Sequence, residues 1–164
     1  MISFFIKVEI VNGKSECKRM VNLTKKSRNL VIFDLDDTLC HEGFSVEEYK
    51  ESFLCLHTKD ILEYLHKQGH VLAIASHNEC AEQISQLCGI LQYFTYIVGY
   101  CPITNTKMPL VQDILNYTTM SKEDVIFFDD VEQNVNEMNE NGIRAKKVCW
   151  KIGITLHDLV QMKL

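Results

Sequence analysis

The sequence has 164 residues, of which 46% are hydrophobic, and a formal net charge of −5. A chain of this size and composition can bury a sizeable core, and we expect it to form one domain rather than two. The negative net charge argues against bulk binding to nucleic acid.

Seven cysteines are scattered along the chain without a Cys-x-x-Cys pair. This pattern predicts neither a disulfide framework nor a zinc site and indicates reduced thiols. The apolar start of the chain is interrupted by Lys7 and Glu9 after six residues, which is too short for a signal peptide or a membrane span. We therefore expect a cytoplasmic protein without a membrane partner.

The first 29 residues differ in charge from the rest, with seven Lys or Arg against two Glu, whereas the remaining 135 residues sum to −10. Residues 2–11 and 17–23 have strand character, and Asn12-Gly13 between them is typical of a tight turn, so we predict a β-hairpin. We assign residues 1–28 to this N-terminal extension and residues 29–164 to the main domain. The basic residues of the extension either form a solvated charged face or contact a phosphorylated macromolecule or a protein partner.

An apolar run over residues 30–33 predicts a buried strand that stops abruptly at acidic residues. Asp34, Asp36 and Asp37 place three carboxylates within four residues, and Thr38 follows them. Because like charges repel, a fold rarely concentrates them beside a buried strand unless a cation belongs there. The sequence therefore predicts a metal site at the end of this strand.

Strand and helix patterns alternate over the rest of the chain. Ser45 can cap a helix that has three glutamates early in it, and residues 58–68 form an amphipathic helix. The apolar run 71–75 ends in Ser76-His77-Asn78 and precedes a helix over 79–88. Later elements are a strand over 93–98, an irregular segment over 99–106, a helix that follows Lys107 and runs to about 117, a strand over 125–128 that ends in Asp129-Asp130, a helix over 132–140, a strand over 144–150 and a C-terminal helix capped by Thr155. This alternation predicts an α/β fold, a Rossmann-like three-layer sandwich with a central parallel sheet.

The polar residues of interest fall at three strand ends, which lie at one edge of a parallel sheet. Asp34 is placed to attack phosphorus, provided that a divalent cation neutralises the charge of the phosphate. Asp36 emerges on the same side of an extended segment, where it can protonate the leaving oxygen and later deprotonate a water molecule. The expected product of the first step is an aspartyl-phosphate on Asp34.

Three other groups complete this predicted site. Ser76 and the backbone amides of His77 and Asn78 precede a helix, where free N–H groups can hold phosphate oxygens. Lys107 offsets the charge that shifts between the nucleophile and the phosphoryl group. Asp129-Asp130 adds the carboxylates of an oxygen-rich site suited to Mg²⁺.

These four motifs, in this order over roughly residues 30–150, resemble the haloacid dehalogenase-like superfamily of phosphohydrolases. The resemblance implies that Asp34 is the nucleophile and a magnesium ligand, and that Asp36 supplies its backbone carbonyl to the metal. It implies that Asp130 is a direct ligand and that Asp129 supports it. Two further positions match the family's motifs, Thr38 in the first and Asn134 in the fourth.

Many members of the superfamily carry a cap domain inserted after the first or second motif. Here the core helices and strands take up most of the residues between the motifs, which leaves no room for a substantial cap. The chain therefore resembles a capless member with an open site. The segments 75–78 and 127–134 are most similar to the magnesium-dependent phosphatase-1 group, which acts on phosphotyrosine peptides and phosphosugars. That group usually has Arg where this chain has His77.

Other functions remain open from the sequence. The phosphatases of the RNA polymerase carboxy-terminal domain share the first motif and the lack of a cap, and the 3′-phosphatases of nucleic-acid ends are another capless group. A phosphotransferase is a further alternative, and so is a non-catalytic module that binds magnesium and phosphate. The sequence leaves the oligomeric state undetermined.

Overall fold

The computed structural model describes residues 4–11, 14–21, 28–43, 45–100 and 106–164, with side chains described from residue 28 onward. Strands β1 (Phe4–Val11) and β2 (Lys14–Val21) pair in antiparallel register. The predicted turn at 12–13 lies outside the described residues. The boundary between an extension over 1–28 and a domain over 29–164 stays a prediction.

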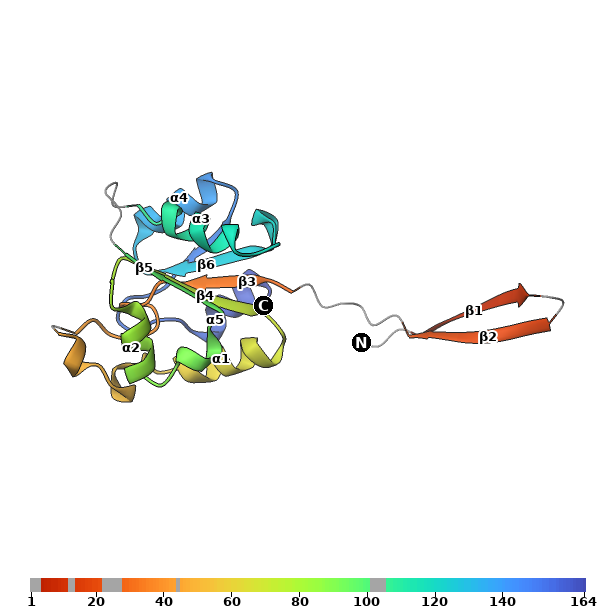
Figure 1. Cartoon of the computed structure of the whole chain (residues 1–164), viewed down its shortest axis with the longest axis horizontal. Coiled ribbons are helices and arrows are strands. Elements are labelled where there is room, and N and C mark those ends of the chain that lie inside the picture. Colours follow the sequence, from red (N-terminus) through yellow and green to blue (C-terminus); the bar gives the residue numbers. More distant parts are fainter. Residues whose placement is uncertain (1–3, 12–13, 22–27, 44, 101–105) are drawn as a thin grey trace.

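The main domain is built on a five-stranded parallel sheet with the order β5-β4-β3-β6-β7 (Figure 1). Its strands are β3 (Leu30–Phe33), β4 (Val71–Ser76), β5 (Tyr96–Gly99), β6 (Val125–Asp129) and β7 (Arg144–Lys147). Its helices are α1 (Thr58–Lys67), α2 (Ala81–Leu87), α3 (Met108–Asn116), α4 (Glu132–Glu140) and α5 (Leu156–Met162). The predicted Rossmann-like three-layer fold is confirmed.

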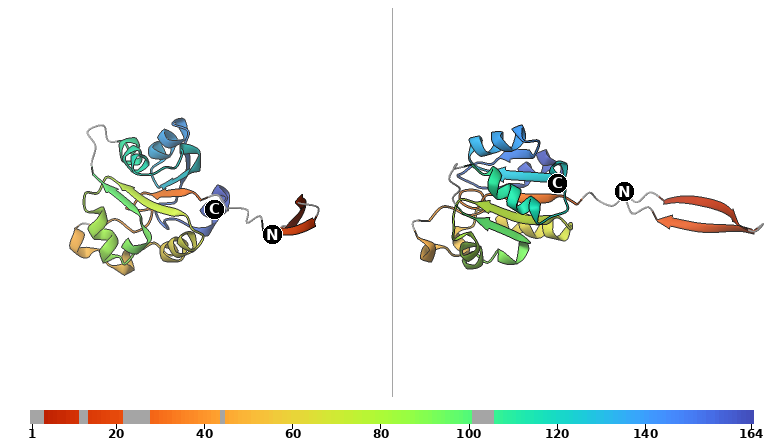
Figure 2. Two further views of the ribbon diagram at one scale, coloured as in Figure 1. Left: turned by 45° about the vertical axis from the view of Figure 1, so that its right-hand side comes forward. Right: turned by 45° about the horizontal axis from the view of Figure 1, so that its top comes forward.

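The helices form two layers, one on each face of the sheet, as the views in Figure 2 also show. Alternate side chains of β3 point to opposite faces of the sheet and pack against different helix layers. Val31 and Phe33 pack into the core on the side of α1, α2 and α5, and Leu30 and Ile32 pack against α3 and α4. A strand that is buried on both faces reads as a continuous apolar run, which is why residues 30–33 could be recognised from the sequence.

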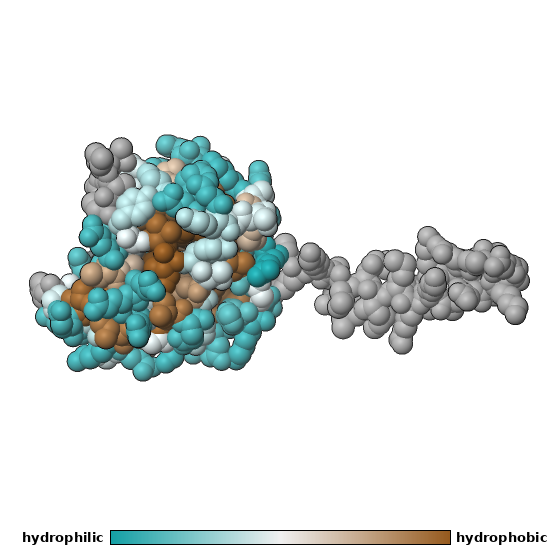
Figure 3. All heavy atoms as spheres, viewed as in Figure 1, coloured by the Kyte–Doolittle hydropathy of each residue, from teal (hydrophilic) through white to brown (hydrophobic). Residues whose placement is uncertain are grey.

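The edge strand β5 is half-buried along its whole length. On the face drawn in Figure 3, apolar side chains gather in the middle of the domain near this strand and α2, and hydrophilic side chains cover the α3 and α4 layer. In the described part of the chain, no helix combines the length and the apolar character that crossing a lipid bilayer requires.

The segment between β3 and α1 differs from its prediction. Instead of a helix after Ser45, it forms two single 3₁₀ turns, Val46–Glu48 and Glu51–Phe53, with Tyr49 between them in an extended conformation. The reason is tertiary, because Leu54 bridges antiparallel to Cys40 and draws the chain back beside the first motif. A continuous helix could not make that return.

Three other expectations need correction at their ends, and one is confirmed in detail. The helix expected over 79–88 is the shorter α2, and the strand expected over 93–98 begins only at Tyr96, after a 3₁₀ turn over Leu91–Tyr93. The strand expected over 144–150 ends at Lys147. Thr155 caps α5 as expected, in a capping box with Asp158.

Candidate active site

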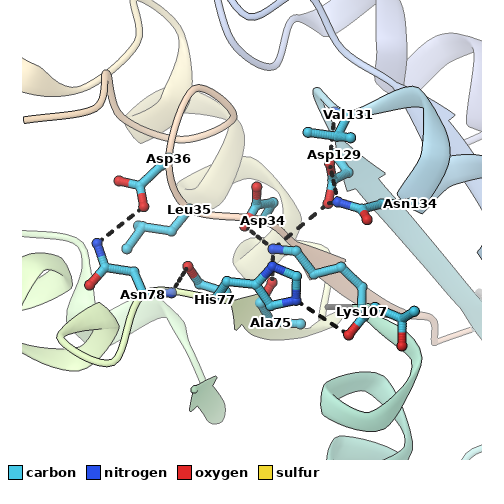
Figure 4. Close-up of polar contacts among 12 residues, drawn as sticks. Asp34, Leu35, Asp36, Ala75, His77, Asn78, Lys107, Asp129, Val131 and Asn134 are labelled. Carbon is cyan, nitrogen blue, oxygen red and sulfur yellow. Dashed lines mark hydrogen bonds and ion pairs between the residues drawn. The ribbon is translucent and has the colours of Figure 1, made fainter. Parts of the chain in front are cut away.

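The carboxyl ends of three neighbouring strands bring the predicted polar residues to one edge of the sheet (Figure 4). β3 lies between β4 and β6, and Phe33 is in register with Ile74 on one side and with Phe128 on the other. Asp34 follows directly, and its backbone N–H still donates to the Phe128 carbonyl at 2.9 Å. Asp129 is the last residue of β6, so the acidic groups of two strands meet at the same level.

Lys107 is the buried cation of this site, with 3% of its surface exposed. Its Nζ donates to Asp34 Oδ1 at 2.5 Å and to the Ala75 carbonyl at 3.0 Å, and it lies 3.9 Å from Asp129 Oδ2. Its backbone N–H donates to Glu137 Oε2 at 3.1 Å. Contacts at both ends of the residue thus fix the ammonium group between the acids.

Asp34 is 7% exposed, and two features of its environment have opposite effects on its pKa. Burial raises the pKa of Asp34 above its ordinary value, and the ion pair with Lys107 opposes that shift. The ammonium group therefore favours the ionised carboxylate that a nucleophile requires.

Asp129 is fully buried, and both of its carboxylate oxygens accept hydrogen bonds. Its Oδ1 accepts from the Val131 backbone N–H at 2.8 Å, and the Asn134 side-chain amide lies 3.0 Å from each of its oxygens. Burial and the charge of Asp34 raise the pKa of Asp129 to about 7. Its neighbour Asp130 is partly exposed, and burial with the charge of Asp34 raises its pKa too.

The donor set at this edge fits a hard divalent cation. Asp34, Asp129 and Asp130 each place a carboxylate oxygen within 4.8 Å of the others. Mg²⁺ prefers one or two carboxylates together with water and phosphate oxygens. Asp34 and Asp130 are placed to hold such an ion directly, whereas both oxygens of Asp129 already accept hydrogen bonds.

The remaining acids of the first motif have separate surroundings. The two oxygens of Asp36 accept from the Tyr49 hydroxyl at 2.8 Å and from the Asn78 side-chain amide at 3.1 Å. Asp37 has φ 58°, in the left-handed region that non-glycine residues rarely adopt. Its Oδ1 accepts from the Glu42 backbone N–H at 3.3 Å, which closes a sharp turn after the motif.

Thr38 lies behind the site rather than in it. The residue is fully buried, and within the described part of the chain its Oγ1 has no hydrogen-bond partner. Its carbonyl accepts from the Ile154 backbone N–H at 3.0 Å. Thr38 thereby joins the first motif to the turn that precedes α5.

Within the segment Ser76-His77-Asn78, more polar groups form hydrogen bonds to the protein itself than the sequence suggested. Ser76 is 1% exposed, and its Oγ accepts from the Asn78 backbone N–H at 3.0 Å. The Asn78 side-chain oxygen accepts from the Cys80 backbone N–H at 3.0 Å, just before α2 begins. His77 Nε2 lies 3.3 Å from the Thr106 carbonyl oxygen. The Ser76 hydroxyl can still donate to a ligand, whereas the Asn78 amide is already engaged.

An open pocket of about 230 Å³ faces these groups. Its lining includes eight of the ten predicted site residues: Asp34, Asp36, Ser76, His77, Asn78, Lys107, Asp130 and Asn134. The other two, Asp129 and Thr38, are fully buried.

Three residues of this region were not expected from the sequence to contribute to the site: Tyr49, Glu42 and Glu137. Glu137 could have been found, because it lies three residues after Asn134 on the same face of α4. Glu42 lines the pocket from a loop, where no pattern marks it. Tyr49 gave no signal, because its contact with Asp36 depends on the return of the chain after the first motif.

Comparison with known proteins decides the family. A model of the haloacid dehalogenase-like hydrolases matches residues 44–148, which include Ser76, Lys107 and Asp129-Asp130. The chain belongs to the haloacid dehalogenase-like hydrolase family. The matched range begins after the Asp34 motif. Comparison with curated protein sequences gives no match.

Solved structures of haloacid dehalogenase-like proteins share the fold. A family protein from Streptococcus pneumoniae is 18% identical with a TM-score of 0.62, and the match covers 82% of this chain and 90% of that chain. A β-phosphoglucomutase from Clostridium difficile is 11% identical with a TM-score of 0.62, over 82% of this chain and 88% of that one.

A further similar structure is the N-terminal part of a Bacteroides fragilis protein, which contains a phosphatase domain complexed with Mg. It is 19% identical with a TM-score of 0.65, and the match covers 87% of this chain and 42% of that chain.

We expect the stability of the metal-free protein to depend on pH through Asp129. The unfolded carboxyl ionises near its ordinary pKa of 3.8, and the folded one ionises near 7. Between these values the folded state binds more protons, so this contribution to stability is complete below about pH 4 and is lost as pH rises through about 7. From about pH 4 to pH 8, the free energy of unfolding should fall by a few kcal/mol more in the parent than in Asp129→Asn. Urea unfolding of both proteins in EDTA measures this difference, and parallel pH profiles would contradict it.

Magnesium should raise the melting temperature of the parent protein, because an ion that binds only the folded state stabilises it. At about 100 times the dissociation constant, the expected gain of about 2.7 kcal/mol corresponds to a shift of roughly 5–10 °C. Asp130→Asn should lose most of this shift, whereas Glu42→Gln, which removes a carboxylate of the same pocket outside the acidic cluster, should keep it. Thermal denaturation with and without MgCl₂ decides the matter, and an undiminished shift in Asp130→Asn would exclude Asp130 as a ligand.

Proposed function

We propose that the chain is a magnesium-dependent phosphatase, a phosphoric monoester hydrolase that works through an aspartyl-phosphate on Asp34. The observation that carries this proposal is the pairing of Asp34 with the buried Lys107 at 2.5 Å, on the floor of an open pocket that also contains Asp130. A buried carboxylate that is oriented by an ammonium group and faces solvent on its other side is suited to nucleophilic attack.

The two chemical steps use groups of this chain in distinct roles. In the first, a carboxylate oxygen of Asp34 forms a bond to phosphorus while the bond from phosphorus to the leaving oxygen breaks, and Asp36 gives that oxygen a proton. In the second, Asp36 takes a proton from a water molecule whose oxygen attacks phosphorus, which releases phosphate and restores Asp34. Lys107 offsets the negative charge that moves between the carboxylate and the phosphoryl group.

The proposed cofactor is Mg²⁺, held by the side chains of Asp34 and Asp130 and, following the family pattern, by the Asp36 backbone carbonyl. Bound there, the ion would neutralise phosphate charge that otherwise repels the attacking carboxylate. Asp129 and Asn134 are proposed to support the ligands Asp34 and Asp130. The Asn134 side-chain amide donates to both carboxylate oxygens of Asp129 and so fixes that group beside them. The magnesium complex of the Bacteroides fragilis phosphatase domain supports this choice of metal.

The non-bridging phosphate oxygens are proposed to contact the Ser76 hydroxyl, the backbone amide of His77 and Lys107. Asn78 has a weaker case for this role, because its backbone N–H and its side chain are both engaged within the protein.

The proposed substrates are phosphotyrosine proteins or phosphosugars, as the similarity to the magnesium-dependent phosphatase-1 group implies. The described residues between β3 and α1 contain only 3₁₀ turns as regular structure, apart from isolated bridges, and this supports a capless, open site. An open site accepts a phosphate on a large molecule as readily as one on a small molecule. A cytoplasmic location remains part of this proposal.

We expect p-nitrophenyl phosphate to be hydrolysed only when Mg²⁺ is present. Asp34→Asn should lower kcat by about 10³-fold or more, because it removes the nucleophile. Asp60→Asn, which changes an exposed carboxylate on α1, is the matched control and should turn over like the parent. Steady-state rates with and without EDTA test these expectations, and hydrolysis that survives in Asp34→Asn would contradict the mechanism.

The same assay separates the substrate classes. Phosphotyrosine peptides, phosphosugars, phosphoserine peptides of the polymerase type and 3′-phosphorylated DNA should be compared by kcat/KM. The proposal expects one of the first two to be preferred. If the folded, magnesium-loaded protein hydrolyses none of them, a non-catalytic module that binds magnesium and phosphate becomes the better interpretation.

A further inference from the structure

Tyr49 lies in the extended step between the two 3₁₀ turns, and only 4% of it is exposed. Its hydroxyl donates to Asp36 Oδ1 at 2.8 Å and accepts from the Gly43 backbone N–H at 2.9 Å. Both contacts are specific to the phenolic oxygen, because a phenylalanine ring would fill the same space without either bond. The ring itself packs against Phe53, with the ring centroids 5.6 Å apart.

Asn78 reaches the other oxygen of Asp36 from a different part of the chain. Its Nδ2 donates to Asp36 Oδ2 at 3.1 Å, while its Oδ1 accepts from the Cys80 backbone N–H at 3.0 Å. The side-chain amide is therefore fixed at both ends. Figure 4 shows it pointing toward the Asp36 carboxylate from the end of β4.

We propose that Tyr49 and Asn78 are positioning residues for the general acid Asp36, an inference that rests on the proposed phosphatase function. Each oxygen of a carboxyl group has two lone pairs, and the two donors occupy one on each oxygen. A lone pair on either oxygen stays available to carry the proton that passes to the leaving oxygen in the first step. The two hydrogen bonds thus fix the plane of the carboxyl group without occupying its reactive position.

Tyr49 also connects Asp36 to the wall of the pocket. A methyl group at Gly43 would lie 2.9 Å from Tyr49 Cε2, so the loop packs closely on the ring. The neighbouring Glu42 lines the pocket. Removing the hydroxyl would release both Asp36 Oδ1 and the Gly43 amide, which loosens the acid together with the wall beside it.

The kinetic consequence depends on the leaving group. A mispositioned acid has little effect on a leaving group that departs readily as an anion, and a large effect on one that needs the proton. Displacement of a reacting group by about 1 Å can cost about 10²-fold in rate. The ratio of kcat/KM values for two such substrates therefore reports on the acid itself. A merely structural change lowers kcat/KM for both substrates alike.

The test compares kcat/KM for p-nitrophenyl phosphate and phenyl phosphate, which differ mainly in the acidity of the leaving phenol. In Tyr49→Phe we expect kcat/KM to fall by about 10- to 100-fold for phenyl phosphate and by less than about threefold for p-nitrophenyl phosphate. Asp36→Asn should show the same pattern more strongly. Asn78→Ala is the second variant and should change the ratio in the same direction.

Tyr100→Phe is the matched control, because its hydroxyl also donates to a carboxylate, Asp113 Oδ2 at 3.0 Å, outside the pocket. It should leave the ratio unchanged. Equal losses for both substrates in Tyr49→Phe and in Asn78→Ala, with hydrolysis still dependent on Asp34, would overturn the positioning role alone. Hydrolysis that persists in Asp34→Asn would overturn the phosphatase mechanism and the positioning role with it.

Discussion

The ion pair between Lys107 and Asp34 is the interaction on which the rest of the site depends. Burying carboxylates is costly unless they are paired, and the acids of β3 and β6 meet at a sheet edge with little exposure. Lys107 is the only Lys or Arg in the described lining of the pocket, and its ammonium contacts Asp34 and lies near Asp129. One cation among several carboxylates leaves negative charge uncompensated, and a divalent ion would balance that charge.

Two helices on one face of the sheet keep this arrangement in place. α4 supplies Asn134 to the oxygens of Asp129 and Glu137 to the backbone N–H of Lys107. The start of α3 is therefore tied to α4 at Lys107, whose ammonium group pairs with Asp34. Tyr49 and Asn78 give Asp36 a comparable set of fixed contacts. Asp34 and Asp36 are thus held by separate parts of the fold.

The sequence was informative wherever a short apolar run ended in polar residues. β3, β4 and β6 are buried on both faces, so their runs and the residues that follow them could be recognised, and their parallel pairing brings Asp34, Ser76 and Asp129 to one edge. Contacts that depend on the tertiary path of a loop could not be predicted. The segment after Ser45 has helical character, but backbone contacts between residues 39–41 and 53–55 turn it back and bring Tyr49 to Asp36. Likewise, periodicity cannot show that the Asn78 amide bonds to Ser76.

Identification of the phosphorylated residue would show directly whether Asp34 is the nucleophile. The magnesium-loaded protein would be mixed with p-nitrophenyl phosphate, quenched during turnover and treated with borohydride, which reduces an aspartyl-phosphate to homoserine. Peptide mass spectrometry would then locate the modified position. If Asp34 is the nucleophile, homoserine appears at position 34 and not at positions 36, 129 or 130. Turnover without modification at position 34, or with modification at another aspartate, would contradict the assignment of Asp34 as the nucleophile.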